Sequence, residues 1–179
     1  MSISTIADFY RISEERDFAR DNQLRVLAIS TGAGIQTDIS QEDLVYAKTS
    51  TLPTRNIQMG QATFMGLDFN IPGNVKYDGS GSYTITFWAD QKLDLWNKMQ
   101  QWTREVFDDA TSTGNYLVPK ASSRITLASV DNNLEVVNTY NLIGVTPVSV
   151  GTLSYDISNS GQVQTFDLNI AYHFWTPEA

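Results

Sequence analysis

The chain has 179 residues, of which 41% are hydrophobic, and its 20 acidic and 12 basic residues give a formal net charge of −8. This length and composition suit a single domain, residues 1–179, with its own hydrophobic core. The lack of cysteine excludes disulfide scaffolds, thiolate nucleophiles and thiolate metal sites. The negative charge argues against tight, charge-driven binding to nucleic acid.

Residues 1–22 mix charged and apolar side chains, which favours an N-terminal arm or short helix. They contain no apolar core flanked by basic residues, and no window of the chain approaches the apolar length of a membrane span. Neither an export signal nor membrane insertion is therefore expected. Residues 24–30 then form a short apolar run typical of a strand.

The polar segment 31–50 is expected to protrude. Gly32 and Gly34 follow the first strand, but the third glycine of a dinucleotide-binding fingerprint is missing and no helix signal follows. We therefore expect a plain turn here and no nucleotide site. Acidic residues are concentrated in the second half of the segment, at Asp38, Glu42 and Asp43.

Residues 55–71 alternate between larger apolar side chains and small or polar ones, which predicts a long strand in which glycines permit bends or bulges. Pro72-Gly73 and the glycines at 79 and 81 mark a connection, and residues 83–87 alternate again. The sequence thus predicts two long strands joined by a protruding loop, residues 68–82.

The period changes between Asp90 and Phe107, where apolar residues recur at intervals of three and four. Asp90 and Asp94 favour a helix start and Arg104 lies near its end, so a helix is predicted at about residues 91–108. Trp96, Met99 and Trp102 lie on its apolar side. Packing against the sheets is the favoured role for these three residues, with a ligand pocket as the alternative.

Two hairpins are predicted in the last third of the chain. Residues 123–130 and 134–143 alternate across an Asp-Asn-Asn turn, and the runs 152–157 and 165–174 alternate across the polar turn at 158–161. In the second hairpin one face is apolar, and the other is small, polar and acidic. No Lys or Arg follows Arg124. A strand-rich chain with one prominent helix results.

Few residues of the chain suit catalysis. His173 is the one histidine; alternation places it on the polar face of a strand, and no serine lies in a nucleophile elbow. The adjacent carboxylates at 14–15, 42–43 and 108–109 lie in polar surroundings typical of solvated surfaces. Calcium-loop and zinc-ligand spacings are missing. We therefore expect no enzyme activity, metal or cofactor.

Several blocks of the sequence, in order, resemble the tail tube proteins of contractile-tailed, T-even-like bacteriophages. Near the N-terminus the block is Asp17-Phe18-Ala19-Arg20-x-Asn22-x-x-x-Val26, followed by Ala47-Lys48 and Thr51-Leu52-Pro53. Near the C-terminus the blocks are Gly144-x-x-Pro147-x-x-x-Gly151-x-Leu153-x-x-Asp156 and Gln164-Thr165-Phe166-x-Leu168-x-Ile170-Ala171-Tyr172-x-Phe174-Trp175. Residues 36–46 depart from the family because this segment is longer than the corresponding loop.

The resemblance implies a mainly β fold, a tail-tube-type sandwich or open barrel with one flanking helix. It also implies a structural virion protein whose subunits form stacked, hexameric rings through sheet continuation. The implied partners are further copies of the chain, the tail sheath protein and a baseplate or tube initiator. Tape measure protein and genomic DNA would pass through the lumen without tight binding. The implied location is the virion tail, after assembly in the host cytoplasm.

Within this interpretation, two sets of residues are candidates for assembly and conduction. The lumen candidates are acidic residues on polar strand faces: Asp68, Asp156 and Asp167. The ring-stacking candidates lie in the segments expected to protrude: Tyr46, Ile71, Pro72 and Tyr77.

Two alternative functions fit the same sequence. One is a tube initiator or baseplate tube component, or the tube of a type VI secretion-like injection machine, all of which share the architecture that the resemblance implies. The other is a monomeric β-barrel that holds a small ligand beneath Trp96 and Trp102. Size in solution distinguishes them, because a ligand carrier remains near the 20.0 kDa of one chain.

Overall fold

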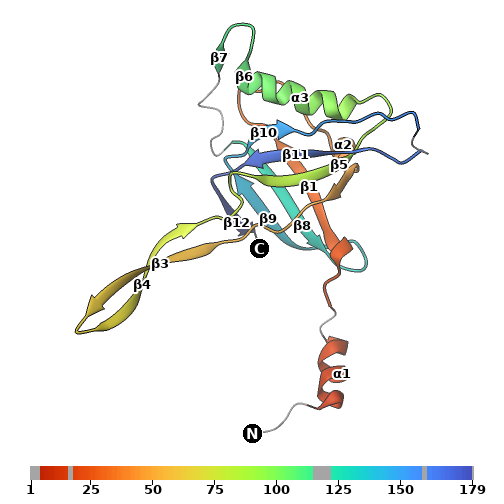
Figure 1. Ribbon diagram of the computed structural model, residues 1–179. Coiled ribbons are helices and arrows are strands. Elements are labelled where there is room, and N and C mark those ends of the chain that lie inside the picture. Colours follow the sequence, from red (N-terminus) through yellow and green to blue (C-terminus); the bar gives the residue numbers. More distant parts are fainter. Residues whose placement is uncertain (1–4, 16–17, 115–121, 159–160, 179) are drawn as a thin grey trace.

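Two four-stranded antiparallel sheets form the body of the protein in a computed structural model that describes residues 5–15, 18–114, 122–158 and 161–178 (Figure 1). The first sheet has the order β1-β8-β9-β12. Its strands are β1 (Leu24–Ser30), β8 (Arg124–Val130), β9 (Val136–Ile143) and β12 (Phe174–Glu178). The second has the order β10-β11-β5-β2. Its strands are β10 (Thr146–Val150), β11 (Thr165–Ala171), β5 (Tyr83–Trp88) and β2 (Ala47–Thr49).

Alternation in the sequence decides which side of each strand faces the other sheet. Phe166, Leu168 and Ile170 of β11 are buried, whereas Asp167 between them is exposed. Phe166 stacks on Phe87 of the neighbouring strand β5, with ring centroids 5.7 Å apart. Residues of this kind from both sheets form one continuous core, which confirms the predicted mainly β fold.

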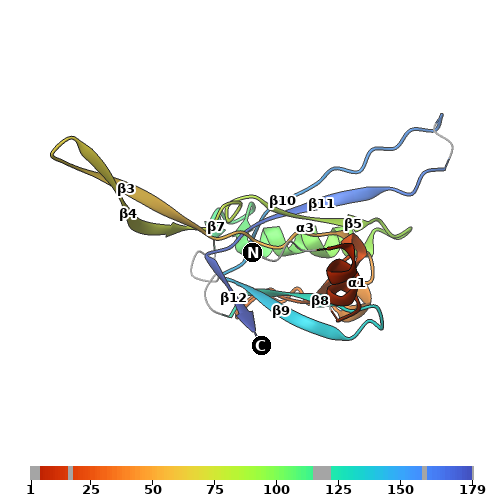
Figure 2. The same ribbon diagram turned by 90° about the horizontal axis from the view of Figure 1, so that it is seen from below.

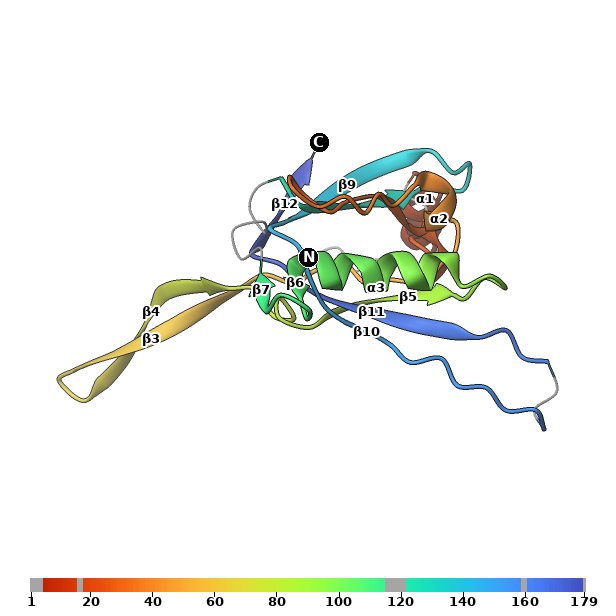
Figure 3. The ribbon, with the colours of Figure 1, turned by 90° about the horizontal axis from the view of Figure 1, so that it is seen from above.

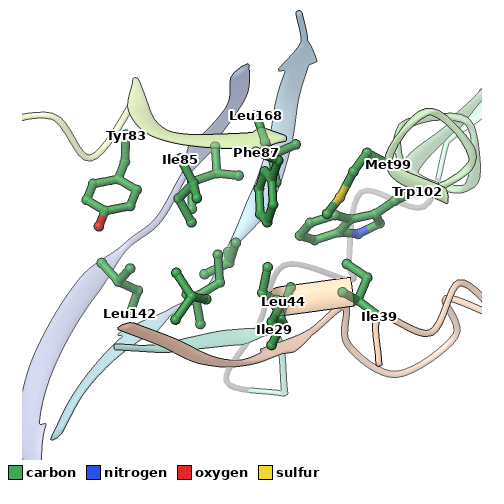
Figure 4. Packing of buried hydrophobic residues seen from close by; sticks show 14 of the residues in the cluster. Ile29, Ile39, Leu44, Tyr83, Ile85, Phe87, Met99, Trp102, Leu142 and Leu168 are labelled. Atoms are coloured by element: carbon green, nitrogen blue, oxygen red, sulfur yellow. The ribbon is translucent and has the colours of Figure 1, made fainter. Parts of the chain in front are cut away.

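Helix α3 (Asp94–Val106) closes one side of the two sheets (Figures 1 and 3). The backbone N–H groups of Asp94 and Leu95 donate to the Asp90 carboxylate, so the helix begins a few residues later than predicted. Met99 and Trp102 are fully buried and point towards Phe87, Leu44 and Ile39 (Figure 4). Trp96 is half-buried, and its indole N–H donates to the Gly151 carbonyl at 3.0 Å.

Strands β3 (Asn56–Phe64) and β4 (Leu67–Lys76) form a two-stranded hairpin that stands away from the body (Figures 1 and 2). We call residues 56–76 the hairpin arm. The prediction of one strand over 55–71 was wrong, because the chain reverses at Met65 and Gly66. Both have positive φ, at 52° and 81°, as a two-residue type I′ turn requires. The expected loop 68–82 is thus mostly the returning strand of this arm.

The C-terminal hairpin also differs from the prediction. Strand β11 pairs with β10, so residues 146–150, and not 152–157, are its ladder partner. Residues 151–157 and 161–164 continue beyond the ladder as an open projection, which we call the extension (Figures 1 and 3). His173 lies between β11 and β12 and not on a strand, since Phe174 already pairs with Ile143 of the other sheet.

The remaining elements are short. They are α1 (Ile6–Glu15), the 3₁₀ turn η1 (Asp21–Gln23), α2 (Gln41–Leu44), β6 (Phe107–Asp108) and β7 (Thr113–Gly114). The segment 31–50 was expected to protrude, but Ile39 and Leu44 are buried in the core and β2 pairs with β5. Helix α1 lies apart from the sheets, within the residues 1–22 for which an arm or a short helix was expected (Figure 1).

Replacing Trp102 by alanine should lower the free energy of unfolding by about 3–5 kcal/mol, because it removes a fully buried indole and leaves a cavity. The measurement is urea denaturation followed by circular dichroism at a concentration where the chain is monomeric. Leu134→Asn is the control, since Leu134 is 69% exposed and has a positive φ that asparagine tolerates. Equal midpoints for the two variants would contradict a core role for Trp102.

Candidate assembly surfaces

The body is well packed, but two of its projections carry apolar surface that the described residues leave exposed. The hairpin arm and the extension leave the body on opposite sides (Figures 2 and 3). Large exposed apolar regions on a soluble protein mark interaction sites. The following exposed apolar side chains lie on the arm: Ile57, Met59, Phe64, Met65, Leu67, Phe69, Ile71 and Val75.

The base of the hairpin arm is held by hydrogen bonds from the body. The Tyr83 hydroxyl donates to the Thr51 carbonyl, the Trp175 indole N–H donates to the Thr54 carbonyl at 3.1 Å, and Asn56 donates to the Asp78 carboxylate. Burial raises the pKa of Tyr83 to about 12. This hydroxyl therefore stays protonated and remains a donor at neutral pH. The arm leaves the body in a fixed direction because its root is anchored.

The stacking candidates do not all lie together. Ile71 and Pro72 are exposed on β4, within the arm, and Tyr77 is half-buried at its base, where it packs against the core. Tyr46 is 42% exposed and lies elsewhere, just before β2, where its carbonyl accepts the N–H of Trp88. The structure thus places two of the four residues on the arm and a third, Tyr77, directly after it.

The outward side of the β10-β11-β5-β2 sheet is a network of short polar side chains. Thr86 donates to Asp167 at 2.7 Å, Thr84 donates to Asn169 at 2.6 Å, and Asn169 donates to Ser149 at 3.0 Å. At the margin of this face the Lys48 ammonium lies 4.4 Å from the centre of the Trp88 ring. These partners cross neighbouring strands, so the face is stabilised laterally.

The three acidic lumen candidates lie on three different parts of the molecule. Asp167 lies on this polar face. Asp68 is on the hairpin arm, where it accepts from Thr63 at 2.6 Å. Asp156 is on the extension, where the hydroxyl and N–H of Ser158 donate to it and lower its pKa. The structure does not bring the three carboxylates together.

Both four-stranded sheets have open margins. Strands β10 and β2 are the edges of one sheet, and β1 and β12 are the edges of the other. Between the edges β1 and β2 lies a groove of about 760 Å³ with a largely apolar lining that includes Val26, Leu44, Val45 and Trp88. Val45 is 80% exposed. Unpaired edges beside apolar surface favour pairing with another chain.

Segment 31–46 is fixed to helix α3 by two carboxylates. Glu105 accepts from the N–H groups of Gln36 and Thr37 at 2.8 and 3.0 Å, and Lys98 pairs with Asp43 at 2.6 Å. Partial burial opposes ionisation of Glu105, but the hydrogen bonds from Thr37, Gln101 and Gln36 outweigh it and lower its pKa. Burial is also offset at Asp43, where Lys98 and Ser40 lower the pKa.

The pattern of the sequence does not predict that several apolar residues are exposed. Tyr155 and Ile157 of the extension follow the alternation of a buried face, yet they are 72% and 105% exposed. The exposed position of Val45 could not be predicted, because a single valine in a polar segment forms no hydrophobic pattern. The exposed face of an edge strand cannot be separated from a buried one by alternation alone.

The described part of the chain contains no cluster of three or more His, Cys, Asp or Glu residues placed to hold a metal ion. None of its helices is both long and apolar enough to cross a membrane. The space beneath α3 holds the side chains of Phe87, Leu44 and Ile39 around Trp102 (Figure 4).

Among known proteins, phage tail tube proteins are similar to the chain. No family model matches the chain. It is 24% identical over 171 residues to the tail tube protein gp19 of Enterobacteria phage T4, covering 95% of this chain and 98% of that protein. The tail tube protein gp19 of Enterobacteria phage T6 is 23% identical over the same coverage. The chain is thus similar along nearly its whole length to phage tail tube proteins.

Solved structures show that the tail-tube-type fold is shared. The chain aligns with one from the sheath-tube complex of an extracellular contractile injection system, with a TM-score of 0.58, 16% identity and 99% coverage of both chains. A chain from the anti-feeding prophage baseplate gives a TM-score of 0.62 at 16% identity, over 90% of this chain and 95% of that one. The phage T4 and T6 relatives are tail tube proteins, which are structural components and not enzymes. This similarity confirms the expectation of a non-enzymatic chain.

Replacing Glu105 by alanine should speed hydrogen exchange at the amides of Gln36 and Thr37 by about tenfold, because both lose a charge-assisted hydrogen bond. Mass spectrometry of the peptide that spans residues 33–40 gives the measurement. Arg104→Ala is the matched control, since Arg104 is its exposed neighbour on α3. Unchanged exchange in Glu105→Ala would show that the carboxylate does not fix the loop.

The same contact has a predictable pH dependence. The pKa of Glu105 is lower in the folded protein than in the unfolded chain. Its stabilising contribution is therefore complete above the ordinary glutamate pKa and disappears as pH falls through the lower, folded-state value.

Proposed function

We propose that the protein is a subunit of the inner tube of a contractile phage tail, where it forms stacked, hexameric rings. The observation that carries the proposal is the match to the T4 tail tube protein along 98% of that protein's length. The geometry supports it, because unpaired sheet edges and an apolar arm suit a subunit whose surfaces are completed by neighbours.

Ring closure by sheet continuation explains the open margins. Edges β10 and β2 lie at opposite sides of one sheet, so a head-to-tail contact between copies pairs the two and closes into a ring when the rotation permits. Each closed ring then has no unpaired edge in this sheet. The hexameric number comes from the family resemblance.

Stacking of rings is assigned to the hairpin arm. The arm carries the candidates Ile71 and Pro72 and is rooted near Tyr77, and its apolar side chains have no partner on the described body of the same chain. A contact between unlike surfaces on the top and bottom of a ring generates a filament. Tyr46 lies beside β2 and is better placed for contacts within a ring.

Replacing Phe64 and Leu67 at the tip of the arm by serine should leave the subunit folded but shorten or abolish tubes. Both side chains are about two-thirds exposed, so the monomer loses little, whereas a stacked ring loses buried apolar area. Negative-stain microscopy measures tube length, and thermal unfolding checks the fold. Tubes of wild-type length would refute stacking through the arm, and Leu134→Asn is the surface control.

We assign the polar face of the β10-β11-β5-β2 sheet to the bore. Its hydroxyls, amides and the Asp167 carboxylate bond to one another, and a negatively charged wall repels phosphate. Tape measure protein and genomic DNA would pass such a wall without tight binding. Asp68 and Asp156 lie on the arm and the extension, so their surroundings in a tube are set by contacts between copies.

Asp167→Lys should slow DNA ejection without shortening the tube, because a cation on the bore wall attracts phosphate. Ejection is followed by fluorescence of a DNA-binding dye, in particles that carry the variant. Asp109→Lys makes the same change in charge at an exposed position after α3. The assignment fails if both variants eject DNA at the wild-type rate.

The remaining partners follow from the same proposal. The sheath-tube complex, the tube terminator and the tube-terminating cap among the structural neighbours support a tube surrounded by a sheath. A baseplate or tube initiator would start the tube, and assembly would take place in the host cytoplasm before the tail becomes part of the virion.

An initiator, or the tube of a type VI secretion-like machine, is the second candidate, supported by the baseplate chain with the TM-score of 0.62. Purified protein that stops at single rings would favour the initiator over the main tube.

A further inference from the structure

The extension carries three large apolar side chains that the described part of the chain leaves exposed. Tyr155, Ile157 and Val163 are 72%, 105% and 67% exposed, and the segment projects clear of both sheets (Figure 3). Residues 152–157 of the extension have no ladder partner among the described strands. Burial of these apolar side chains against a second surface lowers the free energy.

A matching surface lies at the opposite margin of the same sheet. The groove between β1 and β2 is lined by Val26, Leu27, Leu44 and Val45, with Trp88 at one side. Val45 is 80% exposed and Tyr46 beside it is 42% exposed. The backbone of β2 pairs with β5 on one side only, so its other side is available to a further strand.

Strand direction permits the two surfaces to meet. The pairs β10–β11, β11–β5 and β5–β2 are all antiparallel, so β10 and β2 run in opposite directions within the sheet. If a second copy continues the sheet past β2, its β10 arrives antiparallel to β2. The sheet then extends without a change in strand alternation.

Charge favours the same pairing. The two charged residues that line the groove are both basic, Arg25 and Lys48. The one charged residue between positions 151 and 165 is Asp156. Hydrogen bonds from Ser158 lower the pKa of this carboxyl, so it is ionised at neutral pH. An acidic, apolar projection and a basic, apolar groove are complementary.

We infer that the extension of one copy inserts into the β1–β2 groove of the next copy in the ring, with Tyr155 and Ile157 as its apolar anchors. This inference rests on the proposed ring, and it adds which surfaces meet and which residues decide the contact. A second copy is the occupant that fits, because both halves of the contact are present on every subunit at opposite margins. Such a contact is head-to-tail and can close.

Photo-cross-linking tests the contact directly. Benzoylphenylalanine at position 155 replaces an exposed aromatic residue, and irradiation of assembled protein should join it to a peptide containing residues 24–27 or 41–50 of a second copy. The same probe at Phe69, 50% exposed on the hairpin arm, should give different peptides. Cross-links from position 155 that avoid the groove would overturn the inference.

Substitution gives an independent test. Tyr155→Asp with Ile157→Asp should raise the protein concentration needed for ring formation by about 100-fold, because two anchors are lost and acidic charge is added. The melting temperature of the monomer should not change, since both side chains are exposed in it. Val45→Asp, on the groove, should have a similar effect, whereas Leu134→Asn should assemble normally. Analytical ultracentrifugation measures each assembly.

The outcomes separate this inference from the function on which it rests. If the wild-type protein forms neither rings nor tubes, the proposed function fails. If the wild-type protein assembles and the double variant assembles equally well, the function stands and this contact is wrong. A variant that melts at a lower temperature but assembles at the wild-type concentration also counts against the contact.

Discussion

Incomplete backbone pairing at the margins of two open sheets is the constraint on which the rest of this structure depends. In the described chain β2 and β10 each pair with a neighbouring strand on one side only, so the backbone groups on their other side have no ladder partner. This state is unfavourable because apolar surface on the extension, the groove and the hairpin arm stays exposed to water. Association therefore gains both hydrogen bonds and buried area.

Hydrogen bonds at the roots of the projections favour association, because they hold each projection in place before a partner binds. Side chains of the body, Tyr83 and Trp175, bond to the carbonyls of Thr51 and Thr54 at the root of the arm. The half-buried Trp96 bonds to Gly151 at the root of the extension. Each projection thus leaves the core in one direction before any partner arrives. Association then costs less conformational entropy than it would with loosely tethered segments.

The sequence predicts the body better than its projections. Alternation located β8, β9 and β11, and the change of period located α3, because these elements bury one face against the same chain. The same alternation runs through Tyr155 and Ile157, which are exposed. Periodicity identifies a face that can be buried, and says nothing about whether the covering surface belongs to the same molecule.

The turn of the hairpin arm was missed for a local reason. Two-residue hairpin turns are recognised by Asn-Gly or Asp-Gly, and here the pair is Met65-Gly66. Methionine at a positive φ is uncommon, so the apolar pattern reads through the turn as one strand. The lumen candidates show the same limit of pattern-based prediction. Asp68, Asp156 and Asp167 share a pattern along the chain but lie on the arm, the extension and the body.

The polar face that we assign to the bore has to meet two physical requirements. A wall made of strands needs satisfied side chains, and a conduit for a polyanion needs few donors left over to hold phosphate. Thr84, Thr86 and Asn169 direct their donors sideways to acceptors on neighbouring strands, so their hydrogen bonds are used within the sheet. The one cation seen at its margin, Lys48, is held over the Trp88 ring. In a closed ring the β2 edge meets the next β10, which places this lysine at a joint between subunits, where an acidic neighbour can neutralise it. In the proposed ring, the pairing that completes the sheet also removes the feature most able to retain DNA.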